Sequence, residues 1–295
     1  MPSEPPAPAP DACTGAPSGA PPPSLVARLR AAGCVFAEDE AALLVAAAAE
    51  VLGGAGGDAP AAEDLVERLV GRRVAGEPLE TVLGWVAFAG LRLRVGPGVF
   101  VPRRRTELLA RTAVRLARAA GPAPVVVEAC CGVAPVATLV VQDVPDADVH
   151  AADLDPGAVA WASRNLAGRG HVWCGDLLDA LPGRLRGRVD VLVANAPYVP
   201  HDAIATMPPE ARDHEPHLTL DGGPDGVDVQ RRLLADAPAW VRPGGHVLIE
   251  TSRRQAARTC AAAPAGWAVH VLRDDEVDAT VVVARRPPTP VPPPG

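Results

Sequence analysis

The sequence contains no lysine, and all 28 of its basic residues are arginines. Together with abundant alanine, proline and glycine, this bias is typical of a GC-rich genome, so alanine by itself is a weak indicator of helix. The formal net charge is −7 and the pI is about 5.5. Binding along nucleic acid depends on neutralising phosphates. An acidic chain is poorly suited to that task, and we expect no direct nucleic-acid binding.

Long apolar runs are also lacking. A membrane-spanning helix needs about 20 consecutive apolar residues, whereas the run 43–52 is short and is interrupted by Glu50. The first residues, Met1–Pro6, have neither the basic start nor the apolar stretch of a secretion signal. We therefore expect a soluble, cytoplasmic protein that has no membrane partner.

CxxC pairs and Cys/His metal spacings are absent as well. The six cysteines are Cys13, Cys34, Cys130, Cys131, Cys174 and Cys260. In a reducing cytosol, cysteines with such irregular spacing are buried or free thiols rather than disulfides or metal ligands. We expect no metal site.

Composition divides the chain into five segments. Residues 1–23 are rich in Pro, Ala, Ser and Gly, and 287–295 are rich in Pro. Both segments bury too little apolar surface to fold, so we expect them to be disordered. Between them we predict a small helical domain over 24–84, a β-hairpin linker over 85–101 and a large α/β domain over 102–286.

The helical domain is predicted from short amphipathic patterns. Ser24 is a candidate N-cap for a helix that ends at Gly33. The following helices are expected over 38–52, from Pro60 onward, and over 77–83. Residues 84–101 then alternate apolar and polar, which is typical of a hairpin.

Strand and helix patterns alternate in the larger domain. The expected strands are 125–129, 150–153, 172–175, 189–195, 246–250, 268–272 and 279–284, and the expected helices are 135–141, 156–166 and 227–240. Such alternation predicts a doubly wound, mostly parallel sheet. Ligands of such sheets bind beyond the carboxyl ends of the strands.

The first of these strands leads into the turn Glu128–Pro135, which consists mostly of small residues. Small residues let the backbone approach a ligand closely at the start of a helix. Gly132 is the one true glycine of the turn. The turn therefore indicates a nucleotide-like ligand only weakly when it is taken alone.

Acidic residues follow the next two strands. Asp153 can accept hydrogen bonds from both hydroxyls of a ribose, although Asp153 or Asp155 can instead cap the following helix. Asp176 and Leu177 offer an acceptor and an apolar wall to an adenine ring. The alternative for Asp176 is an acid in a solvated loop.

The segment Asn195–Tyr198 (Asn-Ala-Pro-Tyr) follows the apolar strand 189–194. The side-chain oxygen of Asn195 and the main-chain carbonyl of Ala196 can both accept hydrogen bonds from a planar NH₂ group, and Tyr198 can pack on its plane. This grip orients a nitrogen whose lone pair is delocalised, so that catalysis comes from positioning rather than from a strong base. An Asn-x-Pro turn with a purely structural role is the alternative.

The segment resembles Asn-Pro-Pro-Tyr, the signature of S-adenosylmethionine-dependent methyltransferases that act on planar nitrogen. Its surroundings are similar to the HemK/PrmC branch, the protein-(glutamine-N5) methyltransferases that modify the glutamine of the Gly-Gly-Gln loop in peptide-chain release factors. The resemblance covers about residues 24–286. The ordered matches are Gly76–Glu80, Val101–Leu109, Asn195–Pro200, Glu210–Pro216 and Leu220–Gly226.

This resemblance implies a class I, Rossmann-like, seven-stranded methyltransferase domain and a helical domain that holds the release factor. It implies S-adenosylmethionine as cofactor. The implied catalytic residues are Asn195, Ala196, Pro197 and Tyr198. The implied cofactor-binding residues are Cys130, Cys131, Gly132, Val133, Ala134, Asp153, Leu154, Asp176, Leu177 and Asn195.

The chain departs from the family pattern at two places. Ala196 replaces a proline, but its main-chain carbonyl can still accept the hydrogen bond. The Asn-Ala-Pro-Tyr form resembles a divergent subgroup of glutamine methyltransferases. In the cofactor loop, Ala134 stands where the family has glycine, and Val133 removes a candidate hydroxyl donor. If position 134 requires a positive φ, alanine costs about 1 kcal/mol, and we expect weaker cofactor binding.

Other residues near these motifs have two interpretations each. Arg103–Arg105 either contact a carboxylate of substrate or cofactor, or begin a helix in solvent. His214 and Glu215 are expected to shape their loop rather than to act as an acid–base pair. The neighbouring Cys130 and Cys131 are expected to pack in the loop rather than to undergo redox chemistry.

Three functions follow, from two classes. The first is methylation of a release-factor glutamine. The second keeps the cofactor and replaces the acceptor by a small molecule of a biosynthetic pathway, because a fold fixes the donor better than the acceptor. The third is a non-catalytic relative whose cofactor loop is eroded.

Overall fold

The computed structural model describes residues 21–53, 59–207, 212 and 215–289. Contacts within the chain divide it into two units, one that ends at Leu83 and one that begins at Gly84. Most of the two segments predicted to be disordered, namely 1–20 and 290–295, lies outside the described residues.

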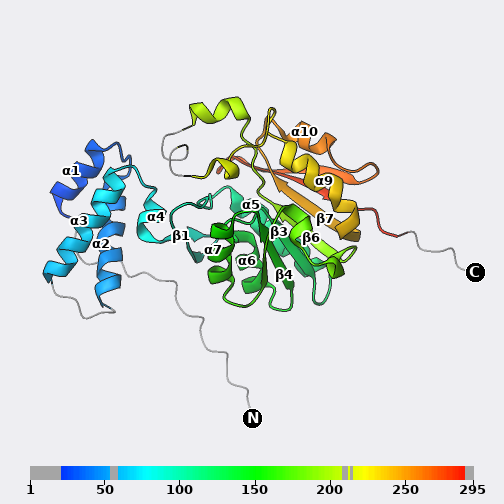
Figure 1. Ribbon diagram of the computed structural model, residues 1–295, viewed down its shortest axis with the longest axis horizontal. Coiled ribbons are helices and arrows are strands. Elements are labelled where there is room, and N and C mark those ends of the chain that lie inside the picture. The colour runs from blue at the N-terminus through cyan, green and yellow to red at the C-terminus, as the bar shows by residue number, and fades with distance from the viewer. Residues whose placement is uncertain (1–20, 54–58, 208–211, 213–214, 290–295) are drawn as a thin grey trace, which may run out of the picture. The chain divides into compact units, whose positions relative to one another are not determined.

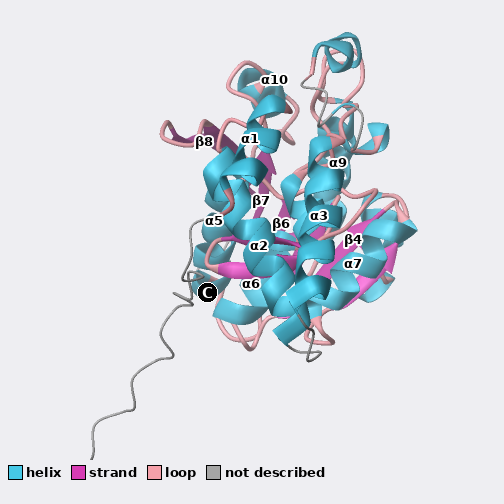
Figure 2. Cartoon of the chain, turned by 90° about the vertical axis from the view of Figure 1, so that its left-hand side faces the viewer, coloured by secondary structure: helices cyan, strands magenta, loops and turns pink. Residues whose placement is uncertain are grey.

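The first unit consists of helices. They are α1 (Pro23–Ala31), α2 (Ala37–Gly53), α3 (Ala59–Val74) and α4 (Leu79–Leu83). Helices α1, α2 and α3 lie side by side (Figure 1, Figure 2). Their apolar faces form one core around the fully buried Leu29, Leu44 and Val70. This core holds the unit together.

Two predicted helix starts in this unit are wrong. Ser24 lies inside α1 and caps nothing, because Pro22 occupies the N-cap position and the helix begins at Pro23. Proline fits the first turn, where a missing N–H is tolerated. The fourth helix begins at Leu79 rather than at Glu77. A residue before proline is disfavoured in a helix, and the Glu77 carboxylate instead accepts from Arg72 at 2.6 Å.

The second unit begins with the predicted hairpin, formed by β1 (Trp85–Phe88) and β2 (Leu91–Arg94). Its turn residues Ala89 and Gly90 both have positive φ, 50° and 87°, as a tight two-residue hairpin turn requires. The turn is anchored because the backbone N–H of Ala89 donates to Glu107 at 3.1 Å. Glu107 thereby ties the hairpin to the next helix.

A seven-stranded sheet forms the centre of this unit (Figure 1). Its strands are β3 (Val125–Ala129), β4 (Asp148–Asp153), β5 (His171–Cys174), β6 (Val189–Ala194), β7 (Val241–Glu250), β8 (Ala268–Asp274) and β9 (Ala279–Arg285). Their spatial order is β5-β4-β3-β6-β7-β9-β8. The strands from β5 to β7 are parallel, and β9 pairs antiparallel with both β7 and β8. The mostly parallel, doubly wound sheet is as predicted.

Helices cover both faces of the sheet. They are α5 (Thr106–Ala119), α6 (Pro135–Asp143), α7 (Pro156–Leu166), α9 (Asp228–Trp240) and α10 (Ala256–Ala261), with short 3₁₀ turns at Leu177–Ala180, Gly183–Leu185, His201–Thr206 and His217–Thr219. Side chains of a strand alternate between faces. On β6, Val191 and Val193 therefore pack with α5, α6 and α7, whereas Leu192 packs with α9. Both faces are dry, which explains the continuous apolar run of this strand.

Strand β7 is longer than predicted, because it begins at Val241 rather than at His246. The added residues include Gly244 and Gly245, and glycine is disfavoured inside a strand. A Cβ on Gly245 would lie 3.0 Å from the Asp190 carbonyl. Glycine therefore permits this close pairing, and the register with β6 shifts between Val189 and Val191.

Within the described ranges, no helix is both long enough and apolar enough to cross a bilayer.

Candidate functional site

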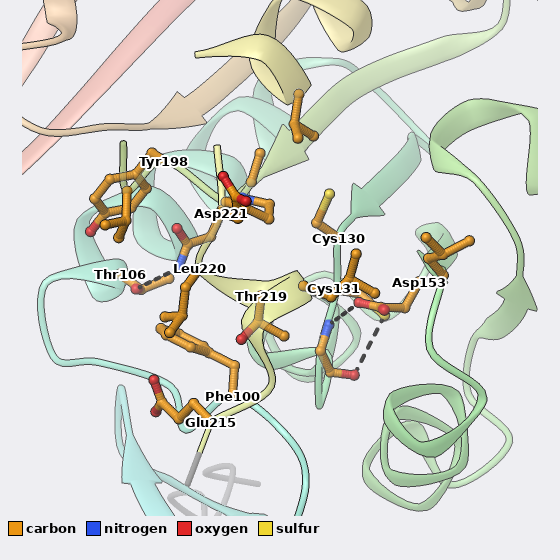
Figure 3. Close-up of a pocket in the computed structure, with 18 of the residues that line it drawn as sticks. Phe100, Thr106, Cys130, Cys131, Asp153, Tyr198, Glu215, Thr219, Leu220 and Asp221 are labelled. Carbon is orange, nitrogen blue, oxygen red and sulfur yellow. Dashed lines mark hydrogen bonds between the residues drawn. The ribbon is translucent and has the colours of Figure 1, made fainter. Parts of the chain in front are cut away.

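One cavity of about 240 Å³ lies beyond the carboxyl ends of β3, β4, β5 and β6. Every predicted site residue except Ala134 lines it. In Figure 3 the residues that line the cavity lie in two groups at its opposite ends. Cys130, Cys131 and Asp153 form one group, and Tyr198, Thr106 and Phe100 form the other. We call the first the cofactor end and the second the acceptor end.

The loop after β3 forms the cofactor end. Its backbone has positive φ at Cys130 (51°), Gly132 (54°) and Ala134 (59°). The N–H of Cys131 donates to the Ala152 carbonyl at 3.0 Å. The carbonyl of Val133 accepts from Asn165 at 2.9 Å. The loop is therefore fixed by its neighbours in a conformation that alanine and cysteine adopt reluctantly.

Ala134 does have the positive φ that would favour glycine. Unlike the other predicted site residues, it does not line the cavity. Its methyl group is fully buried in the hydrophobic core beneath the loop and does not line the cavity. Its carbonyl accepts from the Thr138 hydroxyl at 2.7 Å. Burial of the methyl group among apolar neighbours offsets part of the backbone cost. The positive φ that was considered for position 134 is thus present, whereas the methyl group lies away from the cavity.

Asp153 and Asp155 have separate roles. The Asp153 carboxylate lines the cavity and accepts from the N–H groups of Gly132 (2.8 Å) and of Asp155 (2.9 Å), one on each oxygen. Asp155 caps α7, because its side chain accepts from Gly157 and Ala158. The capping alternative thus holds for Asp155, and Asp153 is left facing the cavity. Burial raises the pKa of Asp153, against the effect of these N–H donors.

The Asp176 carboxylate lines the cavity and forms an ion pair with Arg232 of α9 at 2.6 Å. The sequence analysis did not single out Arg232. Leu177 is buried and lines the cavity, and the exposed Leu154 lines it as well.

Burial raises the pKa of one acid and of two thiols in and next to the loop. Glu128 is buried, and its carboxylate accepts from the first N–H groups of α6, at Val136 (3.2 Å) and Ala137 (2.7 Å). Burial nevertheless raises its pKa to about 8. Burial also raises the pKa of Cys130 to about 12, and that of Cys131 well above its usual value. Neutral thiols are poor nucleophiles, in agreement with the packing role expected of this pair.

Asn195 begins the acceptor end, directly after β6. Its Nδ2 donates to the hydroxyl of Thr106 at 3.5 Å (Figure 3). Ala196 is buried, and Pro197 and Tyr198 are half-buried; all three line the cavity. Burial raises the pKa of the Tyr198 phenol, and the nearby Glu250 charge acts in the same direction. The phenol is therefore neutral at ordinary pH.

The loop that holds Tyr198 is fixed from behind by Gln255. The Nε2 group of Gln255 donates to the main-chain carbonyls of Tyr198 (2.6 Å), Asp225 and Gly226. A Cβ on Gly226 would lie 2.4 Å from the Tyr198 carbonyl. Glycine is required there, which gives a physical reason for the Gly-rich segment 220–226.

The three arginines before α5 differ from one another. Arg103 forms an ion pair with the buried Glu215, and Arg105 donates to the buried Glu250 at 3.4 Å. Both line the cavity, whereas Arg104 is exposed. Glu215 also accepts from the Val101 N–H at 3.5 Å, so that it shapes its loop as predicted. His214 lies outside the described residues.

Sequence reasoning missed Thr106, Glu250, Gln255 and Phe100. Glu250 ends a buried strand at the same edge as Asn195, and the rule that selected Asn195 also applies to it. Thr106 lies within the matched segment Val101–Leu109, which could have drawn attention to it. For Gln255 and Phe100 no comparable signal exists, because their importance comes from neighbours distant in sequence.

Comparison with known proteins identifies relatives over most of the chain. A release factor glutamine methyltransferase of Streptomyces coelicolor is 42% identical over 63% of this chain and 67% of its own. That of Bifidobacterium longum is 34% identical over 81% of this chain and 88% of its own. A 4-amino-L-phenylalanine/4-methylamino-L-phenylalanine methyltransferase of Streptomyces pristinaespiralis is 37% identical over 64% of this chain and 65% of its own.

No protein-family model matches the chain. A solved methyltransferase from Pyrococcus furiosus shares the fold, with a TM-score of 0.50 at 16% identity over 68% of this chain and 90% of its own. The seven-stranded sheet is thus a class I methyltransferase sheet. By its sequence relatives, the chain belongs to the release factor glutamine methyltransferase family of enzymes.

Proposed function

We propose that this protein transfers a methyl group from S-adenosylmethionine to the side-chain amide nitrogen of the glutamine in the Gly-Gly-Gln loop of a release factor. The observation that carries the proposal is the position of Asn195 and Ala196. Both lie at the carboxyl end of β6, on the same cavity as Asp153. Family membership supports the methyl donor and the acceptor.

The residues at the cofactor end fit the proposed cofactor. Each Asp153 oxygen accepts one backbone N–H, and a carboxylate oxygen has a further lone pair that can accept from a ribose hydroxyl. Leu154 and Leu177 can enclose an adenine ring, with Asp176 beside its amino group. The cofactor, when bound, supplies an electrophilic methyl group.

At the acceptor end the chain positions the nucleophile. An amide NH₂ has two hydrogens in one plane, and the Oδ1 of Asn195 and the carbonyl of Ala196 can each accept one. The nitrogen lone pair then points out of that plane, and the half-buried Tyr198 can pack against it. The contribution of these residues is orientation and electrostatic stabilisation of the nitrogen as it becomes positive. As the N–CH₃ bond forms, the S–CH₃ bond would break to leave S-adenosylhomocysteine, and the methylated nitrogen would lose one of its two hydrogens to solvent as a proton.

A small aromatic amine is the second candidate acceptor. The relative from S. pristinaespiralis is named for 4-amino-L-phenylalanine, whose amino group is also a planar NH₂. The same two acceptors can hold it, and Phe100 of the acceptor end offers a surface for its ring.

The first test is calorimetric titration with S-adenosylmethionine. We expect a micromolar Kd, about −8 kcal/mol. The protein and cofactor are then incubated in parallel with a release factor and with 4-amino-L-phenylalanine, and products are analysed by mass spectrometry. One added methyl group on the Gly-Gly-Gln glutamine supports the proposal. A release factor with Gly-Gly-Glu serves as control. Methylation of the amino acid alone favours the second candidate, and cofactor binding without either product contradicts both.

A further inference from the structure

The side-chain amide of Asn195 has two ends that differ chemically. Its Oδ1 accepts hydrogen bonds, whereas its Nδ2 only donates. An acceptor NH₂ can be held only if Oδ1 faces it. Rotation of the amide by 180° would present a donor to a donor, so something must fix the orientation.

Thr106 contacts the Nδ2 end. It is the first residue of α5, and only 1% of its surface is exposed. Its Oγ1 accepts from Asn195 Nδ2 at 3.5 Å, and Figure 3 shows this contact at the acceptor end of the cavity. With Nδ2 engaged there, Oδ1 is directed to the other side of the amide.

A threonine hydroxyl can donate as well as accept, so this contact fixes the amide only if the hydroxyl proton is used elsewhere. The carboxyl of Glu250 lies next to the Thr106 hydroxyl, which acts to lower the pKa of Glu250, and Glu250 Oε2 is buried without a hydrogen-bond partner among the described residues. This oxygen can receive the hydroxyl proton. Glu250 ends β7 and is 1% exposed. Once Thr106 donates to Glu250, its oxygen is left to accept from Nδ2.

Arg105 favours the charged form of the carboxyl. Its Nε donates to Glu250 Oε1 at 3.4 Å. The other titratable group that faces Glu250 is the Tyr198 phenol, whose ring lies 5.9 Å from the Arg105 guanidinium. The neighbouring strand β9 contributes only the apolar Val281 opposite Glu250. Without the arginine, a carboxyl so deeply buried would take up a proton.

We propose that Thr106 and Glu250 are positioning residues, which set the orientation of the Asn195 amide so that its oxygen receives the acceptor nitrogen. Hydrogen bonds then run in one direction, from Asn195 Nδ2 to Thr106 and from Thr106 to Glu250. This inference rests on the proposed function for its meaning in catalysis, but the orientation itself is a property of the protein alone.

Protonation of Glu250 would reverse the direction in which these hydrogen bonds are donated. A neutral carboxyl can donate to Thr106, whose hydroxyl would then donate to Asn195 Oδ1. Burial raises the pKa of Glu250, so this reversal begins at a higher pH than for an exposed glutamate. We therefore expect the rate of methyl transfer to fall on the acidic side. Glu250→Gln, which can donate at every pH, should be slow and should lose that acidic limb.

The chain offers a matched control for the threonine. Thr106→Val removes the hydroxyl and keeps the shape, Thr106→Ser keeps the hydroxyl, and Thr112→Val changes another buried threonine of α5 that does not line the cavity. We expect kcat/KM for the Gly-Gly-Gln release factor to fall about tenfold or more in Thr106→Val. The serine and Thr112 variants should stay within about threefold of wild type, and KM for S-adenosylmethionine should stay unchanged in all three.

Discrimination against a carboxylate reports the orientation directly. With Oδ1 in place, the release factor with Gly-Gly-Glu should compete poorly with the Gly-Gly-Gln form. In Thr106→Val and Glu250→Gln, an amide that presents Nδ2 should bind the glutamate form better, so that this preference shrinks about tenfold. Equal preference in wild type and variants would overturn the inference.

A measurement without substrate tests the orientation of the Asn195 amide separately from the proposed function. In ¹⁵N-labelled protein, the side-chain NH₂ signal of Asn195 is assigned by its loss in Asn195→Asp. We expect slow hydrogen exchange in wild type and Thr106→Ser, and fast exchange in Thr106→Val. Fast exchange in wild type contradicts the inference even if methyl transfer is observed. Slow exchange in wild type that Thr106→Val abolishes supports it even if the acceptor proves to be a different molecule.

Discussion

Single residues of the cofactor loop show how position decides the effect of a side chain. Gly132 and Ala134 both have positive φ, and from sequence alone the alanine was the more serious departure. In the fold, Gly132 lines the cavity, whereas the Ala134 methyl group is buried in the core. The two positions therefore predict opposite responses to the exchange of glycine and alanine.

Ala134→Gly should leave the Kd for S-adenosylmethionine within about twofold, because no cavity surface changes. It removes a buried methyl group worth about 0.8 kcal/mol, which offsets the relief of the positive φ, so that stability should change little. Gly132→Ala should weaken cofactor binding about tenfold. No described atom lies within 4 Å of the added Cβ, so the new methyl group would occupy part of the cavity. Calorimetric titration of both variants tests this. Tighter binding by Ala134→Gly would show that the loop methyl group does face the cofactor.

Asp153 and Asp155 form a second matched pair. Asp153→Asn should weaken cofactor binding by about one to two orders of magnitude, because a charged acceptor of ribose hydroxyls is lost. Asp155→Ala should lower the free energy of unfolding by about 1 kcal/mol through loss of the α7 cap and leave the cofactor Kd unchanged. Titration and urea unfolding of both variants measure this.

The affinity for S-adenosylmethionine should also depend on pH. In the proposed cofactor site, the carboxylate form of Asp153 accepts hydrogen bonds from the ribose hydroxyls, and burial raises its pKa. Cofactor affinity in wild type should therefore fall as pH is lowered through that raised pKa, and Asp153→Asn should show no such loss. If the asparagine variant keeps the same pH dependence, another group is responsible.

Among the elements, α6 is distinguished by the buried acid at its start. Glu128 accepts from the N–H groups of Val136 and Ala137, an arrangement that favours a negative charge at a helix N-terminus. Burial nevertheless raises its pKa to about 8, well above the ordinary value of a glutamate. In the unfolded chain the carboxyl loses its proton near its ordinary pKa, so the folded state binds more protons between these two values.

The free energy of unfolding should accordingly fall as pH rises from about 5 to about 8, with a slope of at most about 1.4 kcal/mol per pH unit from this group. Glu128→Gln imitates the protonated form and should flatten the slope. Urea denaturation at several pH values measures this slope. Asp155→Ala serves as the control, because it should lower the free energy of unfolding without changing how it depends on pH. An unchanged slope in Glu128→Gln would mean that Glu128 is charged in the fold.

Over the whole molecule, the two units have separate cores. The first unit packs around Leu29, Leu44 and Val70, and every residue that lines the cavity lies in the second unit. Leu44→Ala should therefore cost about 3 kcal/mol in the first unit and leave the cofactor Kd unchanged. In calorimetric melting, S-adenosylmethionine should raise the transition of the second unit alone, since a ligand stabilises only what it binds. A shift of both transitions would show that the units unfold together.

The sequence by itself determined the architecture and the edge at which the site lies. Alternating strand and helix patterns are local properties, so the parallel sheet, the hairpin and the order of the helices could be read from them. Asn195, Asp153 and Asp176 were found because each lies at or just beyond the carboxyl end of a strand, and strands of one parallel sheet end at one edge. The Asn-Ala-Pro-Tyr segment then specified the kind of chemistry.

Only the tertiary structure decided which groups act together. Thr106 meets Asn195 from 89 positions away, Glu250 lies beside Thr106, and Arg232 pairs with Asp176. Such contacts depend on how helices pack across strands and on side-chain rotamers, neither of which leaves a periodic signal in the sequence. The same holds for Ala134, whose backbone conformation was anticipated but whose methyl group points to the core. Hydrophobic periodicity fixes which face of an element is buried, and packing in three dimensions fixes what it is buried against.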